Sequence, residues 1–209
     1  MTVLQVELAA ESAVHHVLYD LITHDASEKW PRQGQNVTVL VGGAEVTVSV
    51  INTNGLVDVN RTDEGTLRRI VAAVLPTEDA AILAAGMTAA RPFSDYSSLA
   101  AIEGMSSQEF EFLFPYITLF SGGALPTYPE APSWVKKMLN LKENGKSVLS
   151  GKQATPGNIF RIEAVARMKN AASRRLSAEV LLTGRLDQPY WVYDWSWHLL
   201  DEKREEMPE

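Results

Sequence analysis

The segment NVTVLVGGAEVTVSVI, residues 36–51, carries the strongest local structural signal in the chain. Apolar and polar side chains alternate on both sides of Gly42-Gly43, which is the pattern of two half-buried strands joined by a two-residue turn. Closing that turn places Val39 opposite Val46 on one face, and such matched pairs stabilise a β-ribbon. The sequence therefore predicts a β-hairpin with one apolar face.

A helix is predicted before the hairpin, from about Val3 to Thr23. Its apolar residues recur at the spacing of one helical face: Val14, Val17, Leu18, Leu21 and Ile22. A stripe of this kind needs an apolar partner, and the inner face of a sheet can supply it. No capping Ser, Asp or Asn precedes Val3, so we interpret the first residues as the middle of a longer helix.

The apolar period changes after Asn54-Gly55, and residues of about 60 to 145 are predicted to form a compact, mostly helical unit. Thr62 is the expected cap of its first helix. Ser106 and Glu109 have the Ser-x-x-Glu spacing of a capping box. Pro132 is suited to the first turn of the last helix.

Strand alternation returns near the C-terminus, over Phe160–Met168, Leu176–Leu182 and Tyr190–Trp197. Two strands, a helical block and three further strands most simply form one antiparallel sheet with a helical insertion, which is an α+β fold. The expected domains are a discontinuous α/β domain of residues 1–59 and 150–201, an inserted helical domain of residues 60–149, and a frayed tail of residues 202–209.

The composition is that of a globular protein, with 209 residues of which 45% are hydrophobic and 22% charged. The formal net charge of -7 disfavours nucleic acid as the main partner, because an acidic surface repels phosphate. The chain contains no cysteine, which excludes disulfides and Cys-ligated zinc. We expect no cofactor.

Two catalytic or phosphate-binding signatures are incomplete. Gly145-Lys146-Ser147 resembles the end of a phosphate-binding loop, but Asn140 stands where that motif needs glycine. Ser133-x-x-Lys136 matches the nucleophile motif of penicillin-recognising enzymes without the accompanying downstream motifs. We therefore expect no enzymatic activity and assign no catalytic residue.

His16, Asp20 and His24 follow one another at i, i+4 and i+8 and share one side of the first helix. Histidine and aspartate at this spacing can bind zinc, which makes an uncharacterised metal enzyme one hypothesis. The side that carries them adjoins the apolar stripe, so a solvated polar face is the simpler interpretation. We therefore assign no metal ligand.

Asp58-x-Asn60-x-Thr62 begins like a calcium-binding loop. Asp63 and Arg69 occupy the positions where that loop needs a glycine and a bidentate glutamate. We expect Asp58 and Asn60 to bond nearby backbone amides instead.

Ile102-Glu103-Gly104-Met105 resembles the hairpin of helix-hairpin-helix DNA-binding proteins, which offers backbone amides to a phosphate beside basic residues. Residues 60–120 contain four Arg, no Lys and eight Asp or Glu, so the local charge opposes phosphate binding. A helix-hairpin-helix nucleic-acid-binding module remains the alternative function.

Several short elements follow one another in a fixed order between Val37 and Trp195. They are Leu56-Val57-Asp58-Val59-Asn60, Leu67-Arg68-Arg69-Ile70, Arg91-Pro92-Phe93, Gly104-Met105-Ser106, Leu113 to Thr118, Ser121-Gly122, Ala131-Pro132 and Phe160 to Ala164. Their order and spacing together resemble the K-type minor pseudopilin of the bacterial type II secretion system. The chain departs from the family pattern at residues 125–128, where Leu-Pro-Thr-Tyr stands in place of Asn-rich residues. The insertion is also shorter than in long family members, so their calcium-binding loops cannot be transferred to named positions.

The resemblance implies a type IV pilin-like fold, in which a long N-terminal helix lies on an antiparallel sheet and a helical domain is inserted. It also implies a non-catalytic role at the tip of the pseudopilus, together with the I- and J-type pseudopilins, in support of protein export. Leu4, Val6 and Leu8 are the expected contacts with these partners. The resemblance further implies a periplasmic domain anchored in the inner membrane, with about 20 apolar residues expected before Val3.

Overall fold

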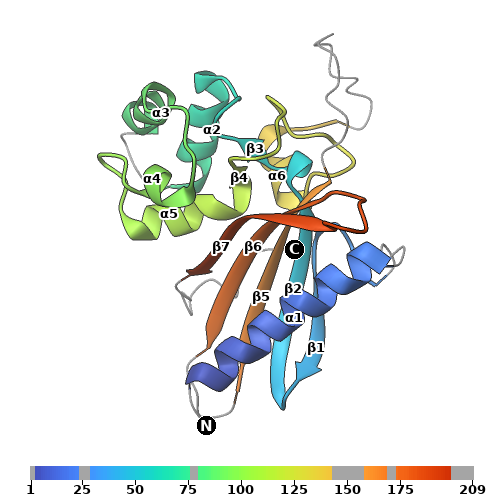
Figure 1. Cartoon of the computed structure of the whole chain (residues 1–209). Helices are drawn as coiled ribbons and strands as arrows, with labels where there is room; N and C mark the ends of the chain where they lie inside the picture. The colour runs from blue at the N-terminus through green and yellow to red at the C-terminus, as the bar shows by residue number, and fades with distance from the viewer. Residues whose placement is uncertain (1–2, 24–28, 76–79, 143–157, 169–172, 199–209) are drawn as a thin grey trace. The chain divides into compact units, whose positions relative to one another are not determined.

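The computed structural model describes residues 3–23, 29–75, 80–142, 158–168 and 173–198. The chain divides into two compact units, of which one comprises residues 1–50 and 160–209 and the other residues 51–159. Each unit has its own hydrophobic core. The fold is α+β, as the sequence predicts (Figure 1).

The first unit combines helix α1 (Val3–Thr23) with a five-stranded antiparallel sheet. The sheet has the spatial order β1-β2-β5-β6-β7. Its strands are β1 (Gln33–Val41), β2 (Ala44–Asn52), β5 (Ile159–Arg167), β6 (Arg174–Leu182) and β7 (Tyr190–His198). In Figure 1, α1 crosses one face of this sheet. The predicted helix and the predicted hairpin are both confirmed.

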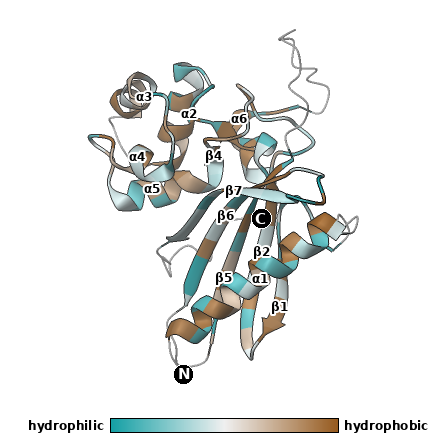
Figure 2. Cartoon of the chain, viewed as in Figure 1, coloured by the Kyte–Doolittle hydropathy of each residue, from teal (hydrophilic) through white to brown (hydrophobic). Residues whose placement is uncertain are grey.

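The core of the first unit lies between α1 and the sheet. Figure 2 shows the hydrophobic positions along α1 and along the strands. The buried residues of the helix are Val6, Ala9, Ala10, Ala13, Val14, Val17, Leu18 and Leu21. The alanines let the helix approach the strands closely, while each buried valine or leucine contributes about 1.5–3 kcal/mol. On the hairpin, Val46 and Val48 are fully buried against the same cluster.

The opposite face of the sheet carries a buried ion pair. Side chains alternate along a strand, so Arg161 points away from the face that Phe160 and Ile162 share. Its Nε and Nη2 atoms donate to Oε1 of Glu179 at 2.7 and 2.5 Å, and both side chains are fully buried. A buried pair of this geometry satisfies both charges, whereas either partner alone would be an uncompensated charge.

The second unit is mostly helical, as expected. Its elements are the 3-10 helix η1 (Thr53–Gly55), β3 (Val57–Asp58), α2 (Glu64–Val74), α3 (Ala80–Ala89), α4 (Tyr96–Ala100), α5 (Ser107–Leu113), the 3-10 helix η2 (Phe114–Tyr116), β4 (Ile117–Thr118) and α6 (Ser133–Leu139). β3 and β4 pair in parallel. Tyr96 packs edge-on against Phe110 and Phe114, with ring centroids 6.3 and 5.0 Å apart.

The boundaries between the units fall at 50/51 and 159/160, whereas the sequence analysis places them at 59/60 and 149/150. The reason at the first boundary is the β3–β4 pairing, since Val57 lies opposite Ile117 and ties residues 51–59 to the helical unit. The tail at 202–209, the motif at 145–147 and His24 lie outside the described residues.

Two helix starts in the second unit depend on side-chain caps. Ser106 Oγ accepts from the Glu109 amide at 3.2 Å, and Glu109 Oε2 accepts from the Ser106 amide at 2.8 Å, so the predicted capping box is confirmed. The Ser106 amide lowers the pKa of Glu109 because it stabilises the carboxylate. The cap predicted at Thr62 is wrong: Asp63 caps α2 instead, because its Oδ1 accepts from the Thr66 amide at 2.9 Å.

Backbone packs directly on backbone where η1 meets the segment before α6. A Cβ atom on Gly55 would lie 2.2 Å from the carbonyl oxygen of Glu130 and 2.8 Å from Cα of Ala131. The Thr127 amide also donates to the carbonyl oxygen of Asn54 at 2.8 Å. Glycine at position 55 is therefore required by the close approach of two chain segments.

We predict that Gly55→Ala lowers the free energy of unfolding by about 2–4 kcal/mol, because backbone atoms must move to admit the methyl group. Urea unfolding followed by circular dichroism measures this change. Gly86→Ala is the matched control: the added Cβ meets only Ile102 Cγ2 at 3.6 Å. Since Gly86 is inside α3, alanine should stabilise the helix by up to about 1 kcal/mol. Equal stability of the two variants would contradict the close approach.

We also predict that Glu179→Ala lowers the free energy of unfolding by about 3–5 kcal/mol, since it leaves the Arg161 charge buried without its carboxylate. The double variant Arg161→Met/Glu179→Leu should recover most of the loss, because it removes both charges and keeps the volume filled. Thermal unfolding of the three proteins measures the effect. A double variant less stable than Glu179→Ala would show that the pair itself stabilises the sheet.

Candidate functional site

The outer face of α1 is the first candidate surface. Leu4 and Leu8 are 61% and 51% exposed, and their i, i+4 spacing places them one turn apart on the same side of the helix. Val6, which the sequence analysis groups with them, is fully buried in the core against the sheet. Its assignment as a partner contact is corrected, because the apolar stripe that packs on the sheet begins at Val6. Leu4 and Leu8 keep surface for a partner.

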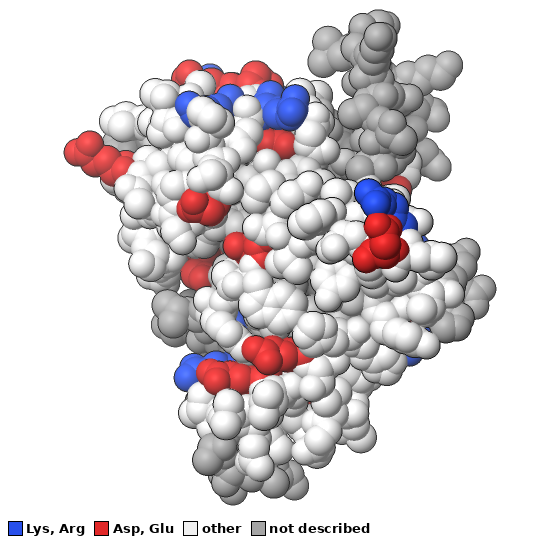
Figure 3. All heavy atoms as spheres, viewed as in Figure 1, with Lys and Arg blue, Asp and Glu red and all other residues white. Residues whose placement is uncertain are grey.

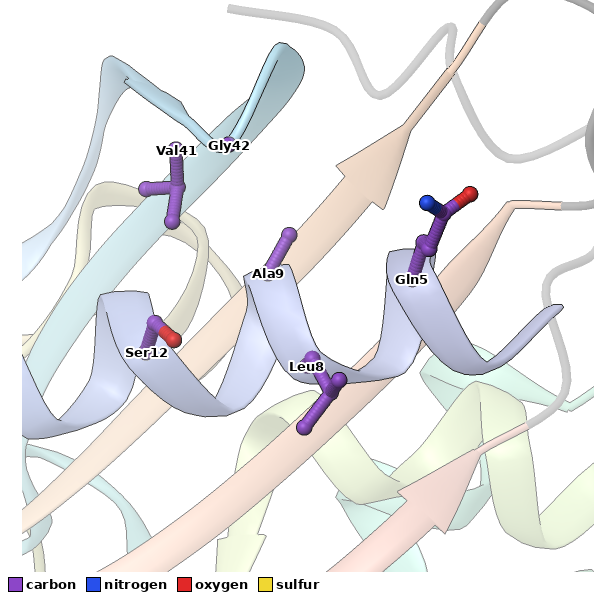
Figure 4. A pocket seen from close by; sticks show the side chains of 6 residues that line it. All are labelled: Gln5, Leu8, Ala9, Ser12, Val41 and Gly42. Atoms are coloured by element: carbon purple, nitrogen blue, oxygen red, sulfur yellow. The ribbon is translucent and has the colours of Figure 1, made fainter. Parts of the chain in front are cut away.

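A shallow, open hollow lies beside Leu8, between α1 and the end of the hairpin (Figure 4). It measures about 220 Å³ and is lined by Gln5, Leu8, Ala9, Ser12, Val41 and Gly42. Figure 4 shows the Val41 side chain reaching from the hairpin toward the helix. The lining is uncharged and mostly small, which suits an apolar side chain from another protein.

The polar side of α1 forms a local cluster around Asp20. Asp20 Oδ2 accepts hydrogen bonds from Lys29 Nζ at 2.6 Å and Trp30 Nε1 at 2.9 Å, and His16 Nε2 lies 3.5 Å away. The hydrogen bond from Lys29 is the main cause that lowers the pKa of Asp20. The ammonium group thus supplies the positive charge beside this carboxylate.

Within the described part of the chain, no group of three or more His, Asp or Glu residues is arranged to hold a metal ion. His24, the third member of the proposed zinc set, lies outside it. The Asp20 cluster instead fixes the buried Trp30 against the helix.

Asp58 is buried and joins two distant parts of the second unit. Its Oδ1 accepts from the Asn60 amide at 2.9 Å. Its Oδ2 accepts from the Gly122 amide at 2.9 Å and from Ser121 Oγ at 3.1 Å. The expectation that Asp58 bonds backbone amides is confirmed, and three of the about four lone-pair directions of its carboxylate are used in this way.

Asn60 makes a second connection beside the first. Its Oδ1 accepts from the Phe93 amide at 2.8 Å, while its Nδ2 donates to the carbonyl oxygens of Phe93 at 3.0 Å and Leu119 at 3.3 Å. Elements that the sequence resemblance lists separately, at 58–60, 93 and 121–122, thus meet in one hydrogen-bonded clamp. Local sequence patterns do not reveal this clamp, because its partners are 33 to 64 residues apart.

The turn at 102–105 has little to offer a phosphate. The Met105 amide donates to the carbonyl oxygen of Ile102 at 3.1 Å, which closes the turn. At the start of the following helix, α5, the Ser106 and Glu109 amides are already bonded within the capping box. The Glu109 carboxylate lies at the start of this helix, where its negative charge repels a phosphate.

The chain matches no protein-family model, and no curated protein sequence matches it. Its structure is similar to a chain in the crystal structure of the GspK-GspI-GspJ complex from the type 2 secretion system of enterotoxigenic Escherichia coli. The similarity covers 94% of this chain and 96% of that chain, with a TM-score of 0.57 and 12% sequence identity. The chain therefore shares its fold with a chain of the GspK-GspI-GspJ complex.

The GspK-like fold confirms the architecture that the sequence resemblance implies: an N-terminal helix, an antiparallel sheet and further helices. No helix within the described residues is both long and apolar enough to cross a membrane. The exposed Leu4 and Leu8 and the hollow beside them all lie on α1, which is the N-terminal helix of this fold.

We predict that Asn60→Ala lowers the free energy of unfolding by about 2–4 kcal/mol, because it removes three hydrogen bonds and leaves the Phe93 amide without its acceptor. Chemical denaturation monitored by tryptophan fluorescence measures the change. The control is Asn36→Ala, the same replacement at an exposed position of β1, which should stay within about 0.5 kcal/mol of the wild type. Similar losses at both positions would contradict a structural role for the clamp.

Proposed function

We propose that the chain is a non-catalytic minor pseudopilin of the K type, which assembles with I- and J-type pseudopilins at the tip of a type II secretion pseudopilus. The observation that carries this proposal is the fold similarity to a chain of the GspK-GspI-GspJ complex, which extends over nearly the whole of both chains. The ordered sequence elements between Val37 and Trp195 support it independently, since they point to the same family.

The polar groups of the molecule are consistent with a structural role. Asp58 and Asn60 hold separate segments of the second unit together, and Asp20 holds Trp30 against α1. Their hydrogen-bonding capacity is used within the fold and is directed at backbone groups or at fixed side chains. This arrangement stabilises a scaffold.

The outer face of α1 is the proposed contact with partner helices. Exposed leucines at i and i+4 are the anchors with which one helix packs on another. The adjacent hollow accepts a side chain from the partner between Leu8 and Val41. In the full-length protein, α1 continues N-terminally into an apolar inner-membrane anchor, so that the domain is held in the periplasm close to its partners.

We predict that Leu4→Ser/Leu8→Ser weakens binding to the I- and J-type pseudopilins of the same genome at least tenfold, because it removes two apolar anchors from the contact. Isothermal titration of the purified proteins measures the affinity. The control is Leu186→Ser, since Leu186 is a fully exposed leucine on the connection between β6 and β7, far along the chain from α1. This control should bind like the wild type.

Two outcomes separate the parts of the proposal. If the double variant binds as tightly as the wild type, Leu4 and Leu8 are not part of the interface, but the proposed function still stands. Failure of the wild-type chain to bind either pseudopilin, alone or mixed, would overturn the function itself.

A further inference from the structure

Strand β7 forms one edge of the sheet and pairs with β6 alone among the described strands. It is rich in exposed apolar side chains, with Trp191 56% and Trp197 41% exposed and Val192 and Tyr193 in between. An edge strand offers a row of backbone amide and carbonyl groups to a further strand, and exposed aromatic residues favour such pairing. This edge therefore has both the backbone and the side chains of a docking site.

The register between β6 and β7 shows which side chains share the face of α1. Trp195 lies opposite Ala178, and Trp197 lies opposite Leu176. Ala178 and Leu176 are both buried in the core under α1. Trp195 and Trp197 therefore lie on the helix side of the sheet, whereas Trp191, opposite Leu181, lies on the other side.

Two contacts show which side of α1 faces this edge. The rings of His15 and Trp195 lie 5.5 Å apart, and Arg174 Nε of β6 lies 3.3 Å from Glu7 Oε1. Glu11 is one helical turn from both Glu7 and His15, so it lies between them on the same side. We call Glu7, Glu11, His15, Trp195 and Trp197 the α1–β7 seam.

The two contacts are separated by about two turns of α1. From Glu7 to His15 the helix rises about 12 Å at 1.5 Å per residue. Glu11 therefore lies between the Glu7–Arg174 and His15–Trp195 contacts, on the side of α1 that faces this edge of the sheet.

The charge of the seam indicates the chemistry of its partner. Figure 3 shows acidic side chains gathered over the N-terminal half of α1. Glu7 is paired with Arg174, but no ion pair or hydrogen bond within the described residues involves the Glu11 carboxylate. The face of a tryptophan ring attracts cations, so a carboxylate and a half-exposed tryptophan on the same side of one sheet edge suit a lysine or arginine.

We propose that the α1–β7 seam binds an extended, basic segment of a partner protein. The segment adds to β7 as a further strand through backbone hydrogen bonds and places a lysine or arginine side chain between Glu11 and Trp197. Backbone pairing supplies affinity in such complexes, while alternate side chains supply specificity. The proposal rests on the geometry of the first unit and does not depend on the pseudopilin function.

A second copy of the chain fits this edge less well than a basic partner does. Antiparallel pairing of two β7 strands about their centre would place Asp194 opposite Asp194, and like charges directly opposite destabilise a sheet. The acidic seams of the two copies would also meet. Charge complementarity thus favours a segment of opposite sign.

The test uses a fluorescently labelled, blocked peptide of four Lys-Val repeats and measures its binding to the whole chain by anisotropy. We expect saturable binding that weakens at least tenfold in Trp197→Ser and in Glu11→Gln. Trp191→Ser, on the other side of the same strand, is the matched control and should stay within twofold of the wild type. Hydrogen exchange at the amides of 194–198 should slow at least tenfold when the peptide is bound. Thermal unfolding verifies that each variant is folded.

Two further peptides distinguish strand addition from simple charge attraction. A peptide of four Glu-Val repeats should not bind, and a Lys-Val peptide with N-methyl groups on alternate residues should bind at least tenfold more weakly, since it cannot complete the backbone bonds. Equal binding of the N-methylated peptide, equal weakening in Trp191→Ser, or no binding of the Lys-Val peptide at low salt would each overturn the proposal. Sedimentation that shows a dimer lost in Trp197→Ser would replace the basic partner by a second copy.

Discussion

Strands β2 and β5 are neighbours in the sheet, and this adjacency constrains the whole chain. Thr53 Oγ1, just after β2, donates to the carbonyl oxygen of Ile159 at the start of β5, at 3.2 Å, although the two residues are 106 positions apart. The chain must therefore leave the sheet and return to the same place. Closing a long loop has an entropic cost that grows only slowly with length, but the residues within the loop must still be ordered.

The second unit meets that requirement with a core of its own. Leu67, Ile70 and Phe114 are fully buried in it. At the end of β3, the clamp of Asp58 and Asn60 adds hydrogen bonds to backbone groups and so joins segments that are distant in the chain. Apolar and polar contacts thus both serve to bring remote parts of one excursion together.

Features that depend on near neighbours in the chain were predictable from the sequence. The period of α1, the alternation around Gly42-Gly43 and the Ser106 capping box each arise within a few residues, and the structure contains all three. The cap at Asp63 was missed because Thr62 beside it has an equally suitable side chain. Val6 was misassigned because its burial depends on where α1 lies on the sheet.

The candidate surfaces differ in the same way. The exposure of Leu4 and Leu8 follows from helical periodicity, whereas the α1–β7 seam can be recognised only once the register of β6 and β7 is known.

The nearness of Thr53 and Ile159 has a consequence for variation among related proteins. The chain leaves the sheet and rejoins it at neighbouring positions. The segment between them can therefore change in length or sequence without altering how the strands of the sheet pair.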